Sequence, residues 1–378
     1  MKILSIIDSK TAYGKERANL EVAHIMSEQG AHIKIVINKI ADASIRNEVS
    51  SFDYTEIPFP RNLGGKKNFL LYIWFFLQAQ IKVTCLFQKE KADYILLPTE
   101  IALAYLYFPL CFSRAKKIFR CGDSPLIYRK NGMFAKIYGI IWKYIILRNV
   151  DTIVCNAKFI QNQIIESGRH LNAKDVIIYN YPPKREVKLD DAKYNKHEGV
   201  LRLGFMGRIV EDKGVKELIR AVRLINKEAE KVIVYICGDS SLDIDYTNEL
   251  KRWSDKSIEF VGEVNNIEKF YDNIDIVVIP SIYPEPMANV VTEAKYHQKA
   301  VIIFNLGGMP EIVEHKKNGY ICKDVNVECL AEAIQYYLDN PNYVKKHGES
   351  AYESIEKMGL TKDIFMKKWA EVFSMPQK

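Results

Sequence analysis

The chain has 378 residues, long enough for two domains, and its 48% hydrophobic and 27% charged residues are those of a soluble globular protein. Seven cysteines without a Cys-x-x-Cys pair argue against a disulfide framework or a zinc site. The net charge of +7 is uneven, because residues 1–180 hold 25 Lys and Arg against 15 Asp and Glu. This positive half is either merely solvated or attracts an anionic surface or acceptor.

The first half of the chain alternates short apolar runs with helical patterns. Residues 2–7 are too short for a signal peptide and predict a first strand that ends at Asp8. Further strands are predicted at 32–37, 92–97, 116–121, 151–155 and 176–179. Helices are predicted between the loop that ends at Gly14 and Gly30, at 67–91 and at 101–112. Short strands that alternate with helices favour a parallel sheet.

Two stretches of this half are unusually rich in aromatic and aliphatic residues. The first, residues 69–77, lies within the long helix predicted at 67–91. The second, residues 133–148, predicts a basic amphipathic helix that carries Lys136, Lys143 and Arg148. Nine consecutive apolar residues are too few to span a bilayer, which needs roughly 20. We therefore expect neither stretch to span a membrane, and either to be a core helix or to lie in the membrane interface.

The second half repeats the strand and helix pattern after a polar, charged segment at 184–199 that we interpret as a linker. A strand at 201–206 is followed by Gly207-Arg208 and, after four residues, by Lys213-Gly214. Later elements are a helix at 215–225, strands at 232–237 and 258–261, the turn Gly262-Glu263-Val264, and helices at 326–339, 341–357 and 361–374. The last helix has an apolar stripe formed by Phe365, Trp369 and Phe373.

Residues 276–314 combine two predicted strands with polar loops and a helix. Apolar runs at 276–279 and 300–304 predict buried strands, and a helix begins near Asn289 between them. Glu285 lies in the loop before this helix and Glu293 in its first turns, while Gly307-Gly308 follows the second strand. Both loops emerge at the carboxyl ends of parallel strands, where open α/β sheets bind ligands. Carboxylates accept hydrogen bonds from sugar hydroxyls, and backbone N–H groups donate hydrogen bonds to phosphates. This combination predicts a sugar-nucleotide site.

Two motifs in this half carry a family resemblance. Glu285-Pro286-Met287-Ala288, four residues, then Glu293-Ala294 resembles the Glu-Pro-Phe-Gly, four residues, Glu-Ala motif of the retaining, group 1 type glycosyltransferases of family 4. Gly207-Arg208, four residues, Lys213-Gly214 is similar to a second signature of that family. The resemblance runs from residue 201 to about 321 and is weaker over residues 1–180. It implies the GT-B fold, an α/β fold with two Rossmann-like domains whose parallel sheets face each other across a cleft.

The resemblance also implies a division into domains. Residues 1–183 would form an N-terminal acceptor-binding domain, 184–199 the linker, and 200–360 a C-terminal domain that binds the nucleotide sugar. Residues 361–378 would form a helix that crosses back to the N-terminal domain.

Roles for single residues follow from the same resemblance. Arg208 and Lys213 would stabilise the diphosphate leaving group, whose negative charge grows in the transition state. Glu285 would hold hydroxyls of the donor sugar, and Glu293 those of the ribose. The implied catalytic set is Glu285, Arg208, Lys213 and Asp123. The implied donor-binding set is Gly14, Gly207, Gly262, Val264, Met287, Ala288, Asn289 and Glu293.

Two of these residues lie in the first half. Gly14, with Glu16 and Arg17, aligns with the family's first loop, which approaches the acceptor or the donor phosphates, although an ordinary strand–helix turn also needs one glycine. Asp123 ends a predicted strand where relatives often have His-Asp, and the histidine is absent here. Asp123 is a candidate for holding acceptor or donor hydroxyls, or else caps its loop.

The implied reaction moves a sugar from a donor such as a UDP-sugar or GDP-sugar to a glycan or lipid-linked glycan, with retention at the anomeric carbon. The enzyme would be a hexosyltransferase or an N-acetylhexosaminyltransferase of bacterial surface polysaccharide or lipopolysaccharide biosynthesis. We expect no cofactor and no metal, because Arg208, Lys213 and a helix end serve the diphosphate. The expected location is cytoplasmic, with peripheral contact between the basic half and the anionic inner face of the cell membrane.

Other functions compete with this interpretation. A GT-A transferase would need Asp-x-Asp for manganese, and the string at 243–245 lies in a polar loop away from the motifs. A dehydrogenase would need Gly-x-Gly-x-x-Gly, of which Gly204 and Gly207 supply only Gly-x-x-Gly. A nucleotide-sugar epimerase with a GT-B-like fold remains open, and it would alter the donor without an acceptor. A basic nucleic-acid-binding protein is the non-enzyme alternative, but no recognised motif supports nucleic acid as a partner.

Overall fold

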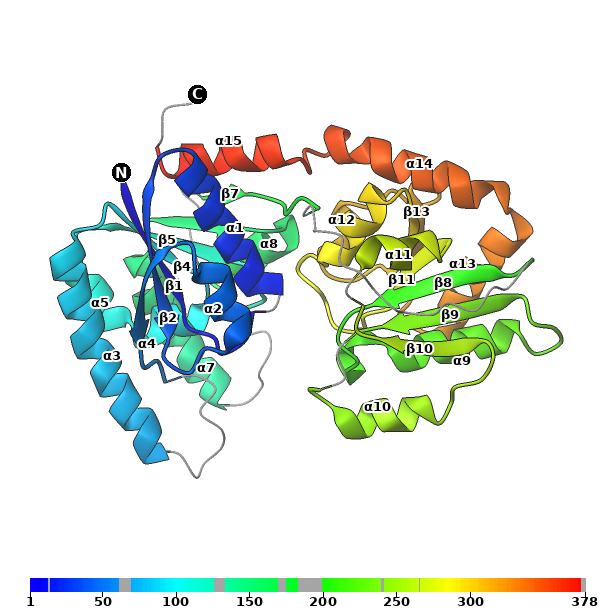
Figure 1. Ribbon diagram of the computed structural model, residues 1–378, viewed down its shortest axis with the longest axis horizontal. Helices are drawn as coiled ribbons and strands as arrows, with labels where there is room; N and C mark the ends of the chain where they lie inside the picture. The colour runs from blue at the N-terminus through cyan, green and yellow to red at the C-terminus, as the bar shows by residue number, and fades with distance from the viewer. Residues whose placement is uncertain are drawn as a thin grey trace. The chain divides into compact units, whose positions relative to one another are not determined.

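The computed structural model describes residues 1–12, 14–60, 69–125, 133–168, 175–182, 199–238, 241–264 and 266–374 (Figure 1). The chain divides into two compact units, which we call unit 1 and unit 2. Unit 1 comprises Met1–Tyr179 and the segment that begins at Lys362, and unit 2 comprises Asn180–Thr361. The linker predicted at 184–199 lies outside the described residues, apart from Gly199.

Unit 1 contains a seven-stranded sheet in the order β3-β2-β1-β4-β5-β6-β7, and all of its described pairings are parallel. Its strands are β1 (Lys2–Ile7), β2 (His32–Asn38), β3 (Asp53–Ile57), β4 (Tyr94–Leu97), β5 (Lys116–Cys121), β6 (Thr152–Cys155) and β7 (Val176–Ile177). The strand order reverses between β1 and β4, so the polar loops after these strands diverge from neighbouring points at the carboxyl edge of the sheet, where ligands of open α/β sheets bind.

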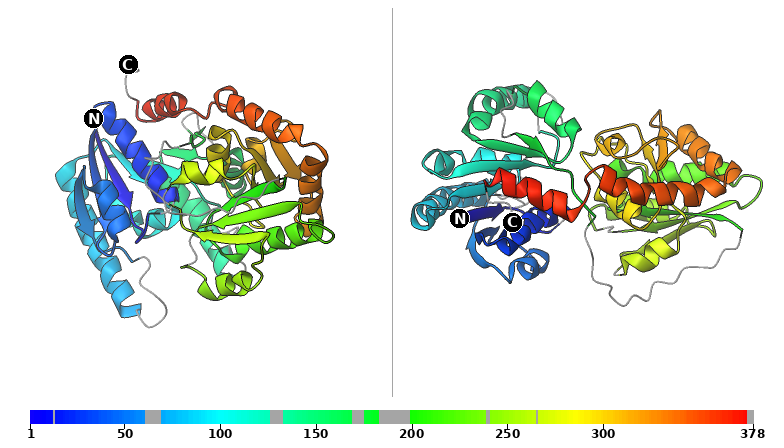
Figure 2. Two further views of the ribbon diagram at one scale, coloured as in Figure 1. Left: turned by 45° about the vertical axis from the view of Figure 1, so that its right-hand side comes forward. Right: turned by 90° about the horizontal axis from the view of Figure 1, so that it is seen from above.

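Helices lie on both faces of the unit 1 sheet (Figure 2). They are α1 (Gly14–Glu28), α2 (Ala43–Val49), α3 (Phe69–Glu90), α4 (Glu100–Tyr105), α5 (Tyr107–Cys111), α7 (Met133–Ile141), the π-helix η2 (Trp142–Ile146), the 3-10 turn η3 (Leu147–Asn149), α8 (Lys158–Glu166) and α15 (Lys362–Val372). The single helix predicted at 101–112 is wrong, because the chain forms α4 and α5 with a break at Leu106 (φ −92°, ψ 9°). Pro109 has no N–H to donate to the carbonyl of Tyr105, so one continuous helix is disfavoured.

Helix α3 corrects the expectation that the first aromatic stretch cannot span a membrane. The segment Leu70–Glu90 has 21 residues, and the mean hydropathy over its most apolar 18 residues is 1.5, so by length and composition alone it could cross a bilayer. The nine consecutive apolar residues at 69–77 are only part of the apolar stretch of this helix, because apolar side chains continue beyond Gln78 and Gln80. The second stretch begins as α7 and continues as η2 and η3 rather than as a single α-helix to residue 148.

The last helix, α15, packs on α1 within unit 1 (Figure 1). Phe365, Trp369 and Phe373, the predicted apolar stripe, are at most 3% exposed. The ring of Phe373 meets Tyr94 of β4 edge-on, with 5.2 Å between their centroids. The final helix therefore contributes core side chains to the unit formed by the first half of the chain.

Unit 2 contains a six-stranded parallel sheet in the order β10-β9-β8-β11-β12-β13. Its strands are β8 (Leu201–Met206), β9 (Val232–Cys237), β10 (Ile258–Gly262), β11 (Ile276–Ile279), β12 (Ala300–Phe304) and β13 (Gly319–Cys322). Its helices are η4 (Glu211–Lys213), α9 (Val215–Ile225), α10 (Ile244–Lys251), α11 (Ile267–Asp272), α12 (Asn289–Tyr296), η5 (Met309–Glu311), α13 (Val327–Asp339) and α14 (Asn342–Lys357). Two Rossmann-like units, each built on a parallel sheet, confirm the predicted α/β class.

Candidate functional site

The two motifs of unit 2 meet where its strand order reverses. The loop with Gly207-Arg208 and Lys213 follows β8, and the loop with Glu285 follows β11, the next strand in the sheet. The backbone N–H groups of Ile282 and Tyr283 donate to the carbonyl oxygen of Asp212 at 3.0 and 3.3 Å. These bonds join the two loops directly, so motifs that are far apart in sequence form one site at the carboxyl edge of the sheet.

Two glycines allow the loops to approach this closely. Gly214 has φ of +67°, and a Cβ there would lie 1.9 Å from the carbonyl oxygen of Pro280. Gly307 has φ of +69°, and a Cβ there would lie 2.2 Å from the carbonyl oxygen of Glu285. That same oxygen accepts a hydrogen bond from the N–H of Gly308 at 2.7 Å. The Gly-Gly loop after β12 therefore fixes the backbone of Glu285, and only glycine fits at Gly307.

The side chains of Glu285 and Lys213 form an ion pair at the centre of this site. They are 13% and 18% exposed, so each is largely withdrawn from water. The buried hydroxyl of Ser281 donates to the same carboxylate oxygen, Oε1, at 2.7 Å. Ser281 was not predicted, although its place in the loop before Glu285 could have indicated it. The site thus holds one cation and one carboxylate in fixed positions.

Helix α12 begins at Asn289, as predicted, with Ala288 as its N-cap. Ala288 has φ of −77° and ψ of 116°, an extended conformation open to any residue, so the glycine usual in the family is not required here. Its methyl side chain cannot cap the helix, and the N–H groups of the first turn retain their partial positive charge. The side chains of Met287 and Ala288 are buried, so these residues present their backbone rather than their side chains to a ligand.

Asn289 itself is held by a residue that the sequence did not reveal. The side-chain amide of Asn180 donates to Oδ1 of Asn289 at 2.8 Å. The two residues are 109 positions apart, and no local pattern marks this pairing. The bond orients the first side chain of α12 and so contributes to the geometry of the helix N-terminus.

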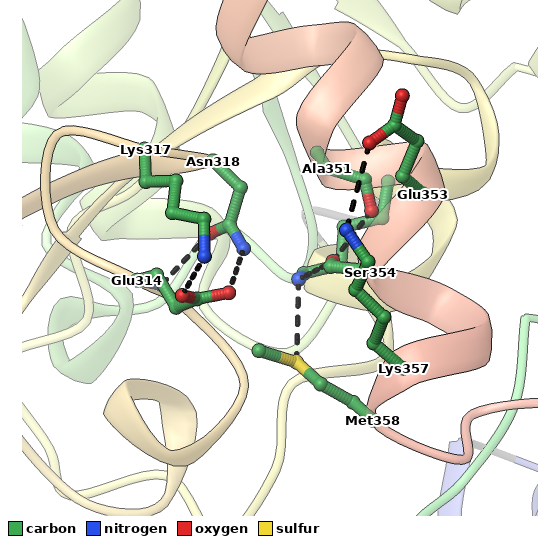
Figure 3. A network of polar contacts seen from close by, with 9 residues as sticks. Glu314, Lys317, Asn318, Ala351, Glu353, Ser354, Lys357 and Met358 are labelled. Carbon is green, nitrogen blue, oxygen red and sulfur yellow. Dashed lines mark hydrogen bonds and ion pairs between the residues drawn. The ribbon is translucent and has the colours of Figure 1, made fainter.

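Behind the site, α12 is tied to α14 through a buried lysine. Glu293 is 5% exposed, and Lys295, two residues later, is fully buried. The amine of Lys295 donates to the hydroxyl of Ser354 at 2.6 Å and lies 3.8 Å from the sulfur of Met358, at the end of α14 (Figure 3). Burial lowers the pKa of Lys295 from 10.5 to about 8, against an opposing attraction from Glu314. Polar contacts therefore anchor the helix that carries Glu293.

The other predicted residues of unit 2 line the same sheet edge. The N–H of Gly207 donates to the carbonyl of Cys237 at 3.0 Å, and that of Gly238 to Gly262 at 2.9 Å. Gly238, which was not predicted from the sequence, has φ of +144°, and a Cβ there would lie 1.7 Å from the carbonyl oxygen of Gly207. The carboxyl ends of β8, β9 and β10 are thus joined. Arg208 is exposed beside them, and Val264 is partly buried.

Two predicted site residues, Gly14 and Asp123, belong to unit 1. Gly14 is the first residue of α1, and its neighbour Lys15 forms an ion pair with Asp123 at 3.0 Å. Asp123 follows β5, so the pair links the first turn of α1 to the loop after β5. Beside it, Arg120 is almost fully buried, and burial lowers the pKa of its guanidinium to about 10. Unit 1 therefore has its own polar cluster at the carboxyl ends of its strands.

The described residues contain no group of three or more His, Cys, Asp or Glu side chains placed to hold a metal ion. The Asp-x-Asp string at 243–245 has a structural role, since Asp243 is the N-cap of α10. Its carboxylate accepts a hydrogen bond from the N–H of Tyr246 at 3.1 Å.

Comparison with known proteins finds similarity to glycosyltransferases. Residues 186–354 match the family described as glycosyl transferases group 1. The chain is 23% identical over 371 residues to the capsular polysaccharide biosynthesis glycosyltransferase CapM of Staphylococcus aureus, a match that covers 95% of this chain and 90% of CapM.

Solved structures share the whole fold. A glycosyltransferase of Rickettsia africae gives a TM-score of 0.78 at 19% identity over 98% of both chains. Anabaena HepE, solved in complex with UDP and glucose, gives a TM-score of 0.76 at 20% identity over 99% of both chains. These likenesses confirm the predicted GT-B fold. The match to group 1 glycosyl transferases covers residues 186–354, and CapM, which is similar over nearly the whole chain, is a glycosyltransferase.

Proposed function

We propose that this protein is a retaining glycosyltransferase of family 4 that moves a sugar from a nucleoside-diphosphate donor to a glycan acceptor. The observation that carries the proposal is the cluster of Lys213, Glu285 and Ser281 beside the N-terminus of α12. A diphosphate leaving group gains negative charge as the glycosidic bond breaks. A fixed ammonium group and a helix N-terminus stabilise that charge without having to reorganise.

Each side chain then has a distinct task. Lys213, with the exposed Arg208, neutralises the diphosphate, while the carboxylate of Glu285 accepts hydrogen bonds from donor-sugar hydroxyls. Glu293, buried on the second turn of α12, serves the ribose hydroxyls. The backbone near Gly262 and Val264 lies against the base. In unit 1, Gly14 and Asp123 serve the acceptor or the far end of the donor.

The donor we propose is a UDP-sugar or GDP-sugar, and the acceptor a glycan or lipid-linked glycan of a bacterial surface polysaccharide or lipopolysaccharide. Support comes from HepE, whose structure was solved with UDP and glucose, and from CapM, whose name assigns it to capsular polysaccharide biosynthesis. Such an enzyme would be a hexosyltransferase or an N-acetylhexosaminyltransferase that works in the cytoplasm, at the inner face of the membrane.

A screen of nucleotide sugars tests the donor. We expect one UDP-sugar or GDP-sugar to raise the melting temperature of the full-length protein and to be hydrolysed slowly without an acceptor, releasing the sugar with its anomeric configuration retained. The configuration is followed by NMR before mutarotation. Inversion would contradict the retaining mechanism. Conversion of the donor into an epimeric nucleotide sugar would instead favour the epimerase.

A chelator tests the proposal that no metal takes part. Because Lys213, Arg208 and the α12 N-terminus serve the diphosphate, we expect hydrolysis and transfer to continue at an unchanged rate in excess EDTA. Loss of activity that manganese restores would show that a divalent cation has a necessary role in charge stabilisation.

A further inference from the structure

Helix α3 exposes an apolar face along its outer side. Leu70, Trp74, Leu77 and Ile81 follow one another at spacings of four, three and four, which places them on one side of the helix. They are 81%, 58%, 50% and 66% exposed. Only 17% of the most apolar stretch of this helix is buried, whereas the core helix of a soluble protein is mostly buried. This face of α3 is therefore not covered by the described residues of unit 1.

The opposite side of α3 packs on the unit 1 core. Its buried residues are Ala79, Val83, Leu86 and Phe87. The side-chain amide of Gln80 also donates to the carbonyl of Tyr105 at 2.7 Å. These contacts hold α3 along the surface of unit 1, at the margin seen in Figure 1 and Figure 2. A helix fixed in this way lies across the protein surface and cannot cross a bilayer without giving up its core contacts.

A second apolar face lies on α7 and η2. Along α7 and η2 the exposed side chains recur at helical spacing and are Ile137, Ile140, Ile141, Tyr144 and Ile145, each 40–62% exposed. Helix α5 packs against both α3 and η3, the turn that follows η2. It carries the exposed ring of Phe108, and the exposed ring of Phe112 follows its last residue. The exposed apolar residues of α3, α5 and α7–η2 are called the apolar face below.

The segments that form the apolar face are strongly basic. Residues 69–90, 107–112 and 133–149 contain the basic residues Lys82, Lys89, Lys136, Lys143 and Arg148. Their one acidic residue, Glu90, forms ion pairs with Lys2 and Lys34 on neighbouring strands. Large apolar side chains with positive charge beside them fit the acyl boundary and headgroups of an anionic membrane. A second copy of this chain would bring like charges together.

We propose that the apolar face binds the surface of an anionic membrane, with α3 lying parallel to the membrane plane. Trp74, Leu77 and Ile81 insert at the acyl boundary, while Lys136, Lys143 and Arg148 contact headgroup phosphates. The proposal names the surface by which the protein would lie at the inner face of the membrane, the location given in the proposed function. The exposure and charge that support it do not depend on sugar transfer. Vesicle binding is measured without any sugar, so its failure leaves the transfer activity to be judged separately.

Co-sedimentation of the full-length protein with vesicles tests the inference. We expect binding to phosphatidylcholine vesicles that contain phosphatidylglycerol, little binding to pure phosphatidylcholine, and weaker binding as salt rises. The Leu77→Ser/Ile81→Ser variant should bind at least about tenfold more weakly, because two exposed apolar anchors are lost. Its matched control is Leu242→Ser/Ile244→Ser on unit 2, whose side chains are 50% and 60% exposed, and this variant should bind like the wild type.

Tryptophan fluorescence reports where the face lies. Trp74 is 58% exposed, whereas Trp142 and Trp369 are fully buried, so a blue shift on vesicle binding that disappears in Trp74→Phe locates α3 in the interface. The inference is overturned if the wild type stays in the supernatant with anionic vesicles at low salt. It is also overturned if both double variants bind equally, or if light scattering shows a dimer that Leu77→Ser/Ile81→Ser abolishes. Binding that neutral lipid supports and high salt leaves intact would overturn it in favour of a spanning helix.

Discussion

At the scale of single residues, Glu285 is the most constrained side chain of the candidate site. Its backbone oxygen accepts from Gly308, one carboxylate oxygen accepts from Ser281, and the same oxygen pairs with Lys213. A glutamate held at its backbone and at its carboxylate loses little conformational freedom when it binds a hydroxyl, which is what a sugar site requires. The ion pair also keeps Lys213 within reach of the loop between β11 and α12.

We therefore predict that Glu285→Gln and Lys213→Ala each lower the rate of sugar transfer at saturating donor by about 100-fold or more. Both residues lie on loops at strand ends, so the circular dichroism spectrum should be unchanged. Lys216→Ala is the matched control, since Lys216 lies one turn further along and pairs with Glu249 outside the site. Near-normal turnover of Glu285→Gln would contradict the site assignment.

The buried amine of Lys295 gives a second residue-scale prediction. Its pKa is about 8 in the folded protein against 10.5 ordinarily, so the unfolded chain binds this proton more tightly. Stability therefore rises as the pH increases from about 8 to 10.5, and the penalty for the buried charge is fully present below pH 8. Relative to Lys295→Met, the wild type should gain about 2–3 kcal/mol of unfolding free energy between about pH 7 and pH 10.

Urea unfolding of the two proteins at both pH values measures this difference. Ser354 still donates to the carbonyl of Ala351 at 2.6 Å in the variant, so removing the amine leaves its proton satisfied. Other groups titrate alike in both proteins and cancel. An unchanged stability difference across this range would mean that Glu314 keeps Lys295 charged in the folded state.

At the scale of elements, the Gly-Gly loop after β12 decides whether Glu285 reaches its place. We predict that Gly307→Ala abolishes donor binding, because the new methyl group would meet the carbonyl of Glu285 as well as strain a positive φ. Gly30→Ala is a control for strain alone. Gly30 has φ of +90° and no atom within 4 Å of an added Cβ. Calorimetric titration with the donor should show binding by Gly30→Ala and none by Gly307→Ala.

The elements also show how far the sequence could be interpreted. Strands at 201–206, 232–237, 276–279 and 300–304 and the helix at 215–225 are confirmed to the residue, because mainly apolar runs that end at glycine, proline or a polar residue mark buried parallel strands. The polar strand β3 and the four-residue β13 were not predicted, since edge strands lack a long apolar run. The break between α4 and α5 also escaped prediction, because apolar periodicity continues across Leu106.

Some residues of the candidate site can be predicted from local sequence, whereas others depend on contacts between distant parts of the chain. Glu285, Lys213 and Asn289 could be predicted because motifs fix their spacing along the chain. Ser281 could have been found from its loop. Asn180 and Lys295 could not, because their partners, Asn289 and Ser354, are 109 and 59 residues away and depend on tertiary packing alone.

At the scale of the whole molecule, unit 1 is discontinuous in sequence. Its strands come from the first half of the chain, but α15 follows all of unit 2. Trp369 of α15 and Phe373, the residue after this helix, are buried in unit 1. A substitution near the end of the chain should therefore weaken the unit formed by its beginning. Unit 2 has a separate core, built around side chains such as Phe304 of β12.

Phe373→Ala and Phe304→Ala form a matched pair that tests this arrangement. Both rings are at most 1% exposed, and removing a buried phenylalanine side chain costs about 3–5 kcal/mol. Phe373→Ala should increase hydrogen exchange in β1, β4 and α1 while β8, β9 and β11 keep their protection. Phe304→Ala should do the reverse, as followed by mass spectrometry of peptides from each unit. If Phe373→Ala raised exchange equally in both units, the two cores would unfold as one cooperative body, and α15 would stabilise the whole chain rather than the unit it packs into.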